Sequence, residues 1–315
     1  MNPVRSAAGR TLAGRPLLGW VLGLCVLAIW SGWVVISRLG VTGQLTAWDI
    51  TALRFAVAAV VILPWALSWG LGGLRLWQAL WLAVSTGAPY AAACFLGFHF
   101  APAAHGAVLI NGTIPLFTLL LGWLLLRHRP QRGQSLGVLL VLGGCFAIGG
   151  DGLLSPVPDQ WKGHLLFLLA ALLLSGYMIA ARRWHVTQRQ ALAAVPLGSA
   201  LLFLPVYLLF DLPSSLKHRP LADWPWGEVA LQAGFQGVIV SLLALVLFTR
   251  ANALLGSTAL AAFVAAVPAV SLLLAIPVLG EVPSALAVAG VVVVTLGVAC
   301  ILGLIRLARP AAAAE

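Results

Sequence analysis

The stretch ALLGSTALAAFVAAVPAVSLLLAIPVLGEVPSALAVAGVVVVTLGVACILGL, residues 253–304, contains two apolar runs that are each long enough to cross a lipid bilayer. A turn built on Gly280-Glu281-Val282-Pro283 joins them. The same pattern occurs 153 residues earlier, where Pro115 matches Pro268 and Pro130 matches Pro283. Between 115–150 and 268–303, 12 of 36 positions are identical without a gap, and three of these are glycines. The chain therefore contains the same membrane hairpin twice.

The composition identifies lipid as the solvent of this chain. Of its 315 residues, 62% are hydrophobic and 8% are charged, against about 25% charged in a soluble domain. The net charge of +10 comes from basic residues scattered between the apolar runs. This distribution is typical of charges that orient a protein in the membrane, and we expect no nucleic-acid partner. The four cysteines lie in separate apolar runs without metal-ligand spacing, so we expect no disulfide, no metal and no cofactor.

Long apolar runs bounded by charge, proline or glycine predict ten membrane spans. The first run is longer than the 7–15 residues of a signal peptide core and is expected to be retained as a helix. The predicted spans are 17–36, 50–69, 76–97, 103–125, 134–150, 163–181, 191–210, 228–249, 255–276 and 284–305. They divide the chain into a tail (1–16), a first five-helix repeat (17–150), an outer linker (151–162), a second five-helix repeat (163–305) and a second tail (306–315).

The distribution of basic residues supports this count. With ten spans and a cytoplasmic N-terminus, 13 of the 18 basic residues face the cytoplasm, four face outward, and Arg54 lies inside a span. This bias is the one that the positive-inside rule requires. Both termini are therefore predicted to be cytoplasmic, in a multi-pass protein of the plasma membrane or bacterial inner membrane.

Five spans per repeat is an odd number, so the second repeat must enter the membrane from the opposite side. The predicted fold is thus an all-α membrane protein of two inverted repeats. Inverted repeats are a known design of secondary transporters, because exchanging the conformations of the two halves alternates access to a site between them. The sequence predicts transport by alternating access.

Several motifs resemble those of the drug/metabolite transporter superfamily, in its EamA-type branch. The resemblance covers nearly the whole chain, and the arrangement from Pro268 to Gly290 is its most specific part. The motifs are Trp30-Ser31-Gly32-Trp33, Leu53-Arg54-Phe55, Ala104 to Leu126 with Pro115, Ser175-Gly176-Tyr177, Pro268 through Gly280-Glu281, and Pro283 to Gly290.

The resemblance implies ten helices, cytoplasmic termini and a central substrate cavity, in proteins that mostly export amino acids, related metabolites or small organic cations. One departure is present. The family usually repeats the glutamate after the fourth helix, whereas Arg127-His128-Arg129 stand there in this chain.

Polar groups inside a span are costly, which makes them candidates for function. Arg54 lies five residues past Asp49, about 7–8 Å below the outer end of its helix. Two interpretations remain open for it: a cation that attracts a substrate carboxylate, or a side chain that snorkels to the interface or pairs within the bundle.

Three neutral amides are further candidates for a polar cavity, with interhelical hydrogen bonding as the alternative. Asn111 lies four residues before Pro115, and Gln232 and Gln236 share one helix face. Five aromatic residues are predicted to line the cavity or, alternatively, to belong to the apolar packing: Trp30, Trp33, Tyr90, Phe95 and Tyr177.

His99 and His105 flank a short outer turn, His164 lies at the start of the sixth span, and Glu281 lies at the outer edge of the last hairpin. They are candidates for proton coupling, and the alternative is a structural or interfacial role. Pro89, Pro115 and Pro268 are predicted helix kinks with a role in gating. Gly133, Gly137, Gly143, Gly144, Gly290 and Gly297 are expected to allow close approach of the fifth and tenth helices, within one chain or between protomers.

Neither an enzyme motif nor a phosphate-binding loop occurs in the sequence, so we expect a gradient-driven transporter and no enzyme. The predicted function is export of amino acids or related small metabolites through a central cavity, by a monomer or homodimer. The alternative is a multidrug or organic-cation antiporter driven by protons. The sequence argues against that alternative because the one charge inside a span, Arg54, is positive.

Overall fold

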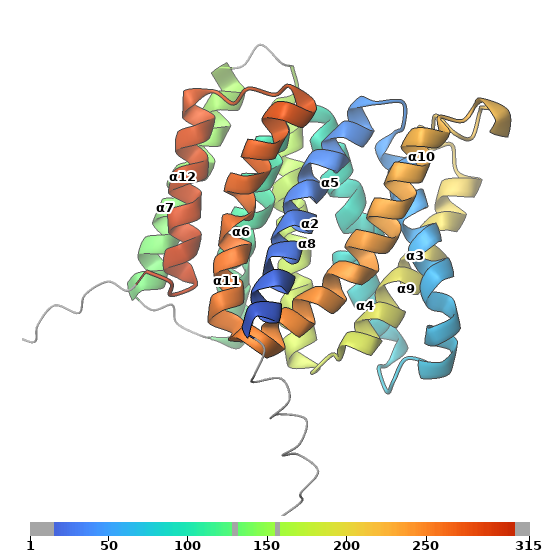
Figure 1. Cartoon of the computed structure of the whole chain (residues 1–315), viewed down its shortest axis with the longest axis horizontal. Coiled ribbons are helices and arrows are strands. Elements are labelled where there is room, and N and C mark those ends of the chain that lie inside the picture. Colours follow the sequence, from blue (N-terminus) through green and yellow to red (C-terminus); the bar gives the residue numbers. More distant parts are fainter. Residues whose placement is uncertain (1–15, 128–131, 155–157, 306–315) are drawn as a thin grey trace, which may run out of the picture.

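The structure, a computed structural model, describes residues 16–127, 132–154 and 158–305. Within these ranges all regular structure is helical (Figure 1), as expected where lipid leaves no water to hydrogen-bond an open backbone. The elements are α2 (Pro16–Thr42), α3 (Ala47–Trp69), α4 (Leu76–Thr86), α5 (Ala88–Phe100), α6 (Ala103–Leu126), α7 (Arg132–Leu154), α8 (Gln160–Arg183), α9 (Gln188–Leu209), η1 (Leu221–Asp223), α10 (Trp226–Gln232), η2 (Ala233–Leu243), α11 (Ala244–Leu279) and α12 (Ala285–Ile301).

Eight helices of the described part are long and apolar enough to cross a membrane, and Ala285–Ile301 is a shorter apolar helix. Two predicted boundaries are corrected. The predicted turn between spans 228–249 and 255–276 is helical, and the break lies at Gly256, whose φ of 80° is unfavourable for other residues. The predicted outer linker 151–162 is shorter, because α7 includes Asp151 and α8 begins at Gln160.

The predicted span 76–97 consists of two helices, α4 and α5, which are separated at Gly87. Pro89 lies in the first turn of α5, where a backbone N–H would have no acceptor within the helix. Proline therefore costs no helical hydrogen bond at this position. Pro115 lies within α6 and Pro268 within α11. A gating role for these prolines stays a prediction.

The bundle has two ends (Figure 1). At one end, which we call the Glu281 end, lie the turns 43–46, 101–102 and 280–284 and the segment 210–225. The first turn of α2 and the last turn of α12 lie at the opposite end. Helices that the sequence repeat matches, such as α7 with α12, run in opposite directions, as an inverted repeat requires.

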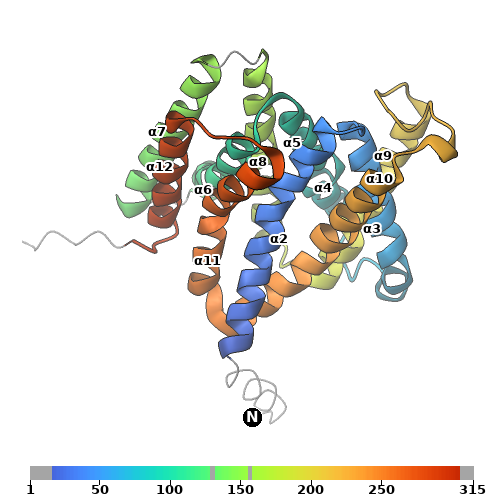
Figure 2. The same ribbon diagram turned by 45° about the horizontal axis from the view of Figure 1, so that its top comes forward.

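The contacts between helices also reflect the inverted repeat. α2 packs against α11 and α6 packs against α8, while α7 pairs with α12 and α3 pairs with α9. In the sequence repeat, α2 corresponds to α8 and α6 corresponds to α11. The α2–α11 contact and the α8–α6 contact are therefore equivalent, and each joins one repeat to the other. Figure 2 shows α7 and α12 together at one edge of the bundle.

Four glycines hold α7 and α12 at backbone contact. A Cβ on Gly137 would lie 2.6 Å from the Gly297 carbonyl oxygen, and a Cβ on Gly144 would lie 2.8 Å from that of Gly290. The expected packing of these two helices is confirmed within one chain. Gly133 and Gly143 are exceptions, because a Cβ there has nothing within 4 Å. Side chains would separate the helices and remove the dispersion contacts that hold them in lipid.

A buried carboxylate joins the two repeats at the Glu281 end. Asp49, in the first turn of α3, is fully buried and forms a capping box with Thr46. Its Oδ1 accepts a hydrogen bond from the Tyr207 hydroxyl on α9 at 2.6 Å, and its Oδ2 accepts from the Ser215 amide at 2.9 Å. The Ser214 hydroxyl also donates to Oδ1. A charge with this many donors is fully compensated, so we interpret Asp49 as structural.

The α7–α12 contact can be tested with two adjacent glycines. Gly144→Ala places a methyl group against the Gly290 carbonyl, and we expect a loss of about 1–3 kcal/mol of stability from overpacking. Gly143→Ala meets nothing within 4 Å and should be neutral or gain up to about 1 kcal/mol in helix propensity. Thermal unfolding of the purified protein in detergent measures both. Equal melting temperatures would contradict the proposed contact.

Asp49→Asn tests the carboxylate that joins the repeats. One oxygen becomes an NH2 group that faces donors, so we expect a loss of about 2–3 kcal/mol and a lower melting temperature. Asp211→Asn is the matched control, because the Asp211 side chain is 95% exposed. An unchanged melting temperature for Asp49→Asn would show that the network adds nothing to stability.

Candidate functional site

Arg54 is a buried cation without a carboxylate partner. It lies in the second turn of α3 with 7% of its surface exposed. Its Nε donates to the Ser241 hydroxyl at 3.1 Å, and its guanidinium lies 5.3 Å from the centre of the Phe55 ring. Its Nη1 has no hydrogen-bond partner, and no acidic group of the described residues forms an ion pair with it. Burying an unpaired charge costs free energy, so a residue of this kind inside a membrane is a candidate for function.

The partner of Arg54 lies on a π-helix. η2 places the Ser241 hydroxyl 2.7 Å from the carbonyl oxygen of Gln236, five residues earlier. Gly237 allows this segment to approach α3 closely, since a Cβ there would lie 3.2 Å from the Arg54 carbonyl oxygen. π-Helical turns are rare and frequently occur at functional sites. Here the wider turn brings a hydroxyl to Arg54.

Gln232 and Gln236 connect this segment to α2. Gln232 Nε2 donates to the Ile36 carbonyl at 2.8 Å, and Gln236 Nε2 donates to the Ser37 hydroxyl at 3.1 Å. Gln236 also donates to Gln232 at 3.2 Å. Both side chains are fully or almost fully buried, and Gln236 Oε1 has no partner. The two amides therefore hold helices together, and one acceptor stays available.

Aromatic side chains close the other side of this region. Trp33 stacks on Tyr90 with ring centres 6.4 Å apart and meets the edge of Phe98 at 5.9 Å. Its indole N–H is buried and has no partner. Tyr90 and Cys94, one turn apart on α5, lie within electrostatic reach of Arg54. The helices that carry the indole and the guanidinium, α2 and α3, both contact α5.

These groups form what we call the central polar cluster, which consists of Trp33, Ser37, Arg54, Tyr90, Gln232, Gln236 and Ser241. Three of its buried polar atoms have no partner: the Trp33 N–H, Nη1 of Arg54 and Oε1 of Gln236. Buried polar groups are nearly always hydrogen-bonded in folded proteins, and each exception requires an explanation. Two of these atoms are donors and one is an acceptor.

The remaining candidates from the sequence make other contacts. Trp30 packs against Phe248 with ring centres 5.2 Å apart, and Phe95 is fully buried in the main apolar cluster, to which Trp33 and Tyr90 also belong. Tyr177 packs against a smaller apolar cluster that contains Leu82 and Ala194. The Asn111 amide donates to the carbonyl of Ala107 in its own helix at 3.1 Å. His99 is exposed and lies against Phe100.

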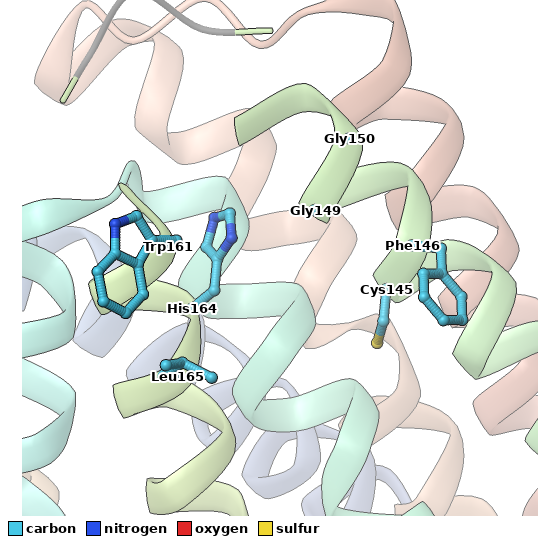
Figure 3. A pocket seen from close by; sticks show the side chains of 7 residues that line it. All are labelled: Cys145, Phe146, Gly149, Gly150, Trp161, His164 and Leu165. Atoms are coloured by element: carbon cyan, nitrogen blue, oxygen red, sulfur yellow. The ribbon is translucent and has the colours of Figure 1, made fainter. Parts of the chain in front are cut away.

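A pocket of about 420 Å³ lies away from this cluster, between α7 and α8 (Figure 3). It is lined by Cys145, Phe146, Gly149, Gly150, Trp161, His164 and Leu165. Most of these side chains are apolar, and His164 is the titratable imidazole among them. None of the residues that the sequence predicted to bind substrate lines this pocket.

Glu281 and Arg38 connect the repeats at the Glu281 end. Arg38 Nε and Glu281 Oε1 form an ion pair at 2.7 Å, and the amide of Ala103 donates to Glu281 Oε2 at 2.8 Å. Arg38 also donates to the carbonyls of Phe98 and His99. The glutamate of the last hairpin therefore holds α2 and the first turn of α6.

Some members of these networks carried no signal in the sequence. Ser241 lies five residues after Gln236, so helical periodicity of 3.6 residues does not place them together. Arg38 is one of the four basic residues that the charge distribution predicts to face outward, and its partners became apparent only with the packing. A polar residue within three positions of a predicted helix end is the feature of the sequence that could have indicated members of these networks.

These observations define a multi-pass helical membrane protein with a buried polar site. The sequence model of the EamA-like transporter family matches residues 17–150 and 161–303. The chain therefore belongs to the EamA-like transporter family, and it is an integral membrane transporter.

Two relatives agree with this assignment, and a solved structure has a similar fold. The uncharacterized transporter YwfM of Bacillus subtilis (strain 168) is 26% identical over 241 residues, which are 76% of this chain and 78% of YwfM. The uncharacterized transporter YetK of the same organism is 26% identical over 250 residues, 76% of this chain and 74% of YetK. One crystal structure covers 90% of this chain and 95% of its own with a TM-score of 0.58 and 21% identity, and this likeness shows the fold alone.

The cost of the unpaired cation can be measured directly. Arg54→Met removes a buried charge and keeps a similar shape, so the substrate-free protein should gain about 1–2 kcal/mol and melt at a higher temperature. Ser241→Ala is the matched variant, because it keeps the charge and removes the acceptor of Nε; it should melt at a lower temperature. A lower melting temperature for Arg54→Met than for the wild type would mean that Arg54 is structural.

Proposed function

We propose that this protein is a secondary transporter that exports amino acids or related small metabolites carrying a carboxylate. The observation that carries the proposal is the buried guanidinium of Arg54, which has an unpartnered Nη1 and no acidic neighbour. A substrate carboxylate supplies the missing acceptor, and it also accepts from the Trp33 indole. Gln236 Oε1 then accepts from an amino group of the same substrate.

The chain is proposed to cross the membrane ten times. Trp226–Leu279 has 54 residues and would measure about 80 Å as one helix, more than twice the roughly 30 Å of the hydrocarbon core. Gly256 divides it at the end opposite to Glu281, so it supplies two crossings. Leu76–Phe100 counts as one crossing, and Ala285–Ile301 runs along α7 as the last. Basic side chains such as Arg75, Arg182 and Arg250 then favour a cytoplasmic position for that end.

Alternating access is supported by the position of the central polar cluster. Trp33, Arg54 and Tyr90 come from the first repeat, whereas Gln236 and Ser241 come from the second. Rocking of one repeat against the other would change the distance between these two groups. A substrate site at this cluster would lie at the interface between the repeats, as it does in inverted-repeat transporters, and this supports the proposal.

An antiporter of organic cations is the alternative. It requires an acidic or strongly aromatic site that attracts a positive charge. Asp49 is occupied by hydroxyl and amide donors, and Glu281 is paired with Arg38. Since the unpaired charge of the cluster is positive, the described residues favour a carboxylate substrate. Export is the direction that the family resemblance implies.

Transport of purified protein in proteoliposomes tests the proposal. Liposomes loaded with a mixture of unlabelled amino acids are diluted into buffer with one labelled amino acid, and tetraethylammonium is tested in the same way. We expect counterflow with at least one amino acid and none with the cation. Counterflow of the cation alone would overturn the choice of substrate class. Absence of counterflow with every compound would contradict transport of either class.

Arg54→Gln identifies the group that binds the carboxylate. We expect the KM for the transported amino acid to rise by about 10-fold or more, because a charge-assisted hydrogen bond contributes about 1.5–3 kcal/mol. The corresponding primary amine without the carboxylate should be transported no worse by the variant than by the wild type. Arg75→Gln removes an exposed arginine and serves as the control. An unchanged KM in Arg54→Gln would rule out this role.

A further inference from the structure

Three titratable side chains form a continuous hydrogen-bonded chain at the Glu281 end. His105, on the first turn of α6, lies in the middle: its Nε2 is 3.0 Å from Asp151 Oδ2, and its Nδ1 is 3.0 Å from His164 Nε2. Asp151 ends α7, and His164 lies near the start of α8. The chain thus joins two helices of the first repeat to the first helix of the second.

The carboxylate determines where the protons lie on both rings. An ionised Asp151 only accepts, so Nε2 of His105 must carry a hydrogen. In neutral His105 the lone pair is then on Nδ1, and His164 Nε2 must donate to it. Neutral His164 therefore has its own lone pair on Nδ1. In both imidazoles the Nε2–H points toward Asp151 and the lone pair is on Nδ1, so the two rings have the same orientation along the hydrogen-bonded chain.

This orientation allows a proton to move through the chain. A proton that binds His164 at Nδ1 releases the hydrogen on Nε2, which passes to His105 Nδ1 across the existing hydrogen bond. His105 then carries the positive charge and keeps its Nε2–H bonded to Asp151. No other atom has to move, and the charge ends beside a carboxylate.

The pocket between α7 and α8 borders this hydrogen-bonded chain at His164. His164 lines the pocket, while His105 is 2% exposed and has no such access of its own (Figure 3). The Asp151 side chain is 19% exposed. The buried imidazole of His105 therefore contacts two partly exposed groups, and His164 is the one that lines the pocket of about 420 Å³.

Protonation at His105 would act on contacts between the repeats. The Ser284 hydroxyl, which caps α12, donates to the other oxygen of Asp151. Glu281 and Arg38 are the further charged groups that act electrostatically on His105, and they form their own ion pair between α2 and the last hairpin. A cation at His105 strengthens its bond to Asp151 and holds the ends of α6, α7, α8 and α12 together.

We propose that Asp151, His105 and His164 form a proton-binding relay that takes up a proton from the α7–α8 pocket and thereby strengthens the contacts between the repeats at the Glu281 end. The relay makes the transporter proton-coupled, and in this respect it rests on the proposed function. Its ligand is the proton, its acceptor is the His105 imidazole, and its counter-ion is Asp151.

The first test needs no substrate. The protein is labelled with 15N-histidine, placed in lipid nanodiscs and titrated with acid while the imidazole signals are followed by NMR. We expect His105 and His164 to titrate as a coupled pair, so that His164→Gln shifts the titration midpoint of His105. His218→Gln is the control, because His218 is exposed and lies outside the relay. A His105 titration that is identical with and without His164 would overturn the relay.

The second test measures coupling in the same proteoliposomes, with the membrane potential clamped. For one proton per substrate, a gradient of one pH unit supports up to about 10-fold accumulation of the transported amino acid. We expect wild type and His218→Gln to approach this ratio, and His105→Gln and Asp151→Asn to fall to about one, each normalised to its own counterflow. Gradient-driven accumulation in those two variants equal to that of the wild type would overturn the proposal.

The two proposals fail in different ways. Wild-type counterflow without any effect of the gradient overturns the relay and leaves transport standing. Absence of counterflow with every compound overturns the proposed function, and the NMR titration still decides whether the three groups share a proton.

Discussion

The constraint on which this structure depends is that lipid offers no hydrogen bonds to the backbone. Every amide and carbonyl in the apolar interior must be satisfied within the chain, and helices achieve this locally. Without a hydrophobic force between helices, close packing holds them together. The contact of α7 with α12 through Gly137, Gly144, Gly290 and Gly297 is the clearest case, because backbone meets backbone there.

The same constraint separates structural from functional polar groups. Asp49 is buried among hydroxyl and amide donors from both repeats, so its charge is compensated. Arg54 is equally buried and has a single hydroxyl acceptor, with Nη1 unpartnered. In a low-dielectric interior this difference is large. For this reason Arg54, and not Asp49, is the group that we propose to bind a substrate.

Much of the fold was predictable because it is encoded in local composition. Apolar runs gave the helices, and the match of Pro115 to Pro268 gave the repeat. Boundaries were wrong where helical hydrogen bonding continues through polar residues, as it does from Arg250 to Gly256 and at Asp151. Of the candidate site residues, Trp33, Arg54, Tyr90, Gln232 and Gln236 are together in the structure. Trp30, Asn111 and Tyr177 contact other groups, and Phe95 shares only the apolar packing around Trp33 and Tyr90, since residue type alone does not specify which helix face meets which neighbour.

The sequence by itself determined the solvent, the helices, the repeat and the family, because each depends on composition or on spacing along the chain. The tertiary structure decided which polar groups remain without partners. A π-helical turn places Ser241 at Arg54, and the packing of α6, α7 and α8 aligns Asp151, His105 and His164. Hydrogen bonds between distant helices require distances correct to a few tenths of an ångström. Such precision arises from the packing of the whole bundle and is not encoded in any local stretch.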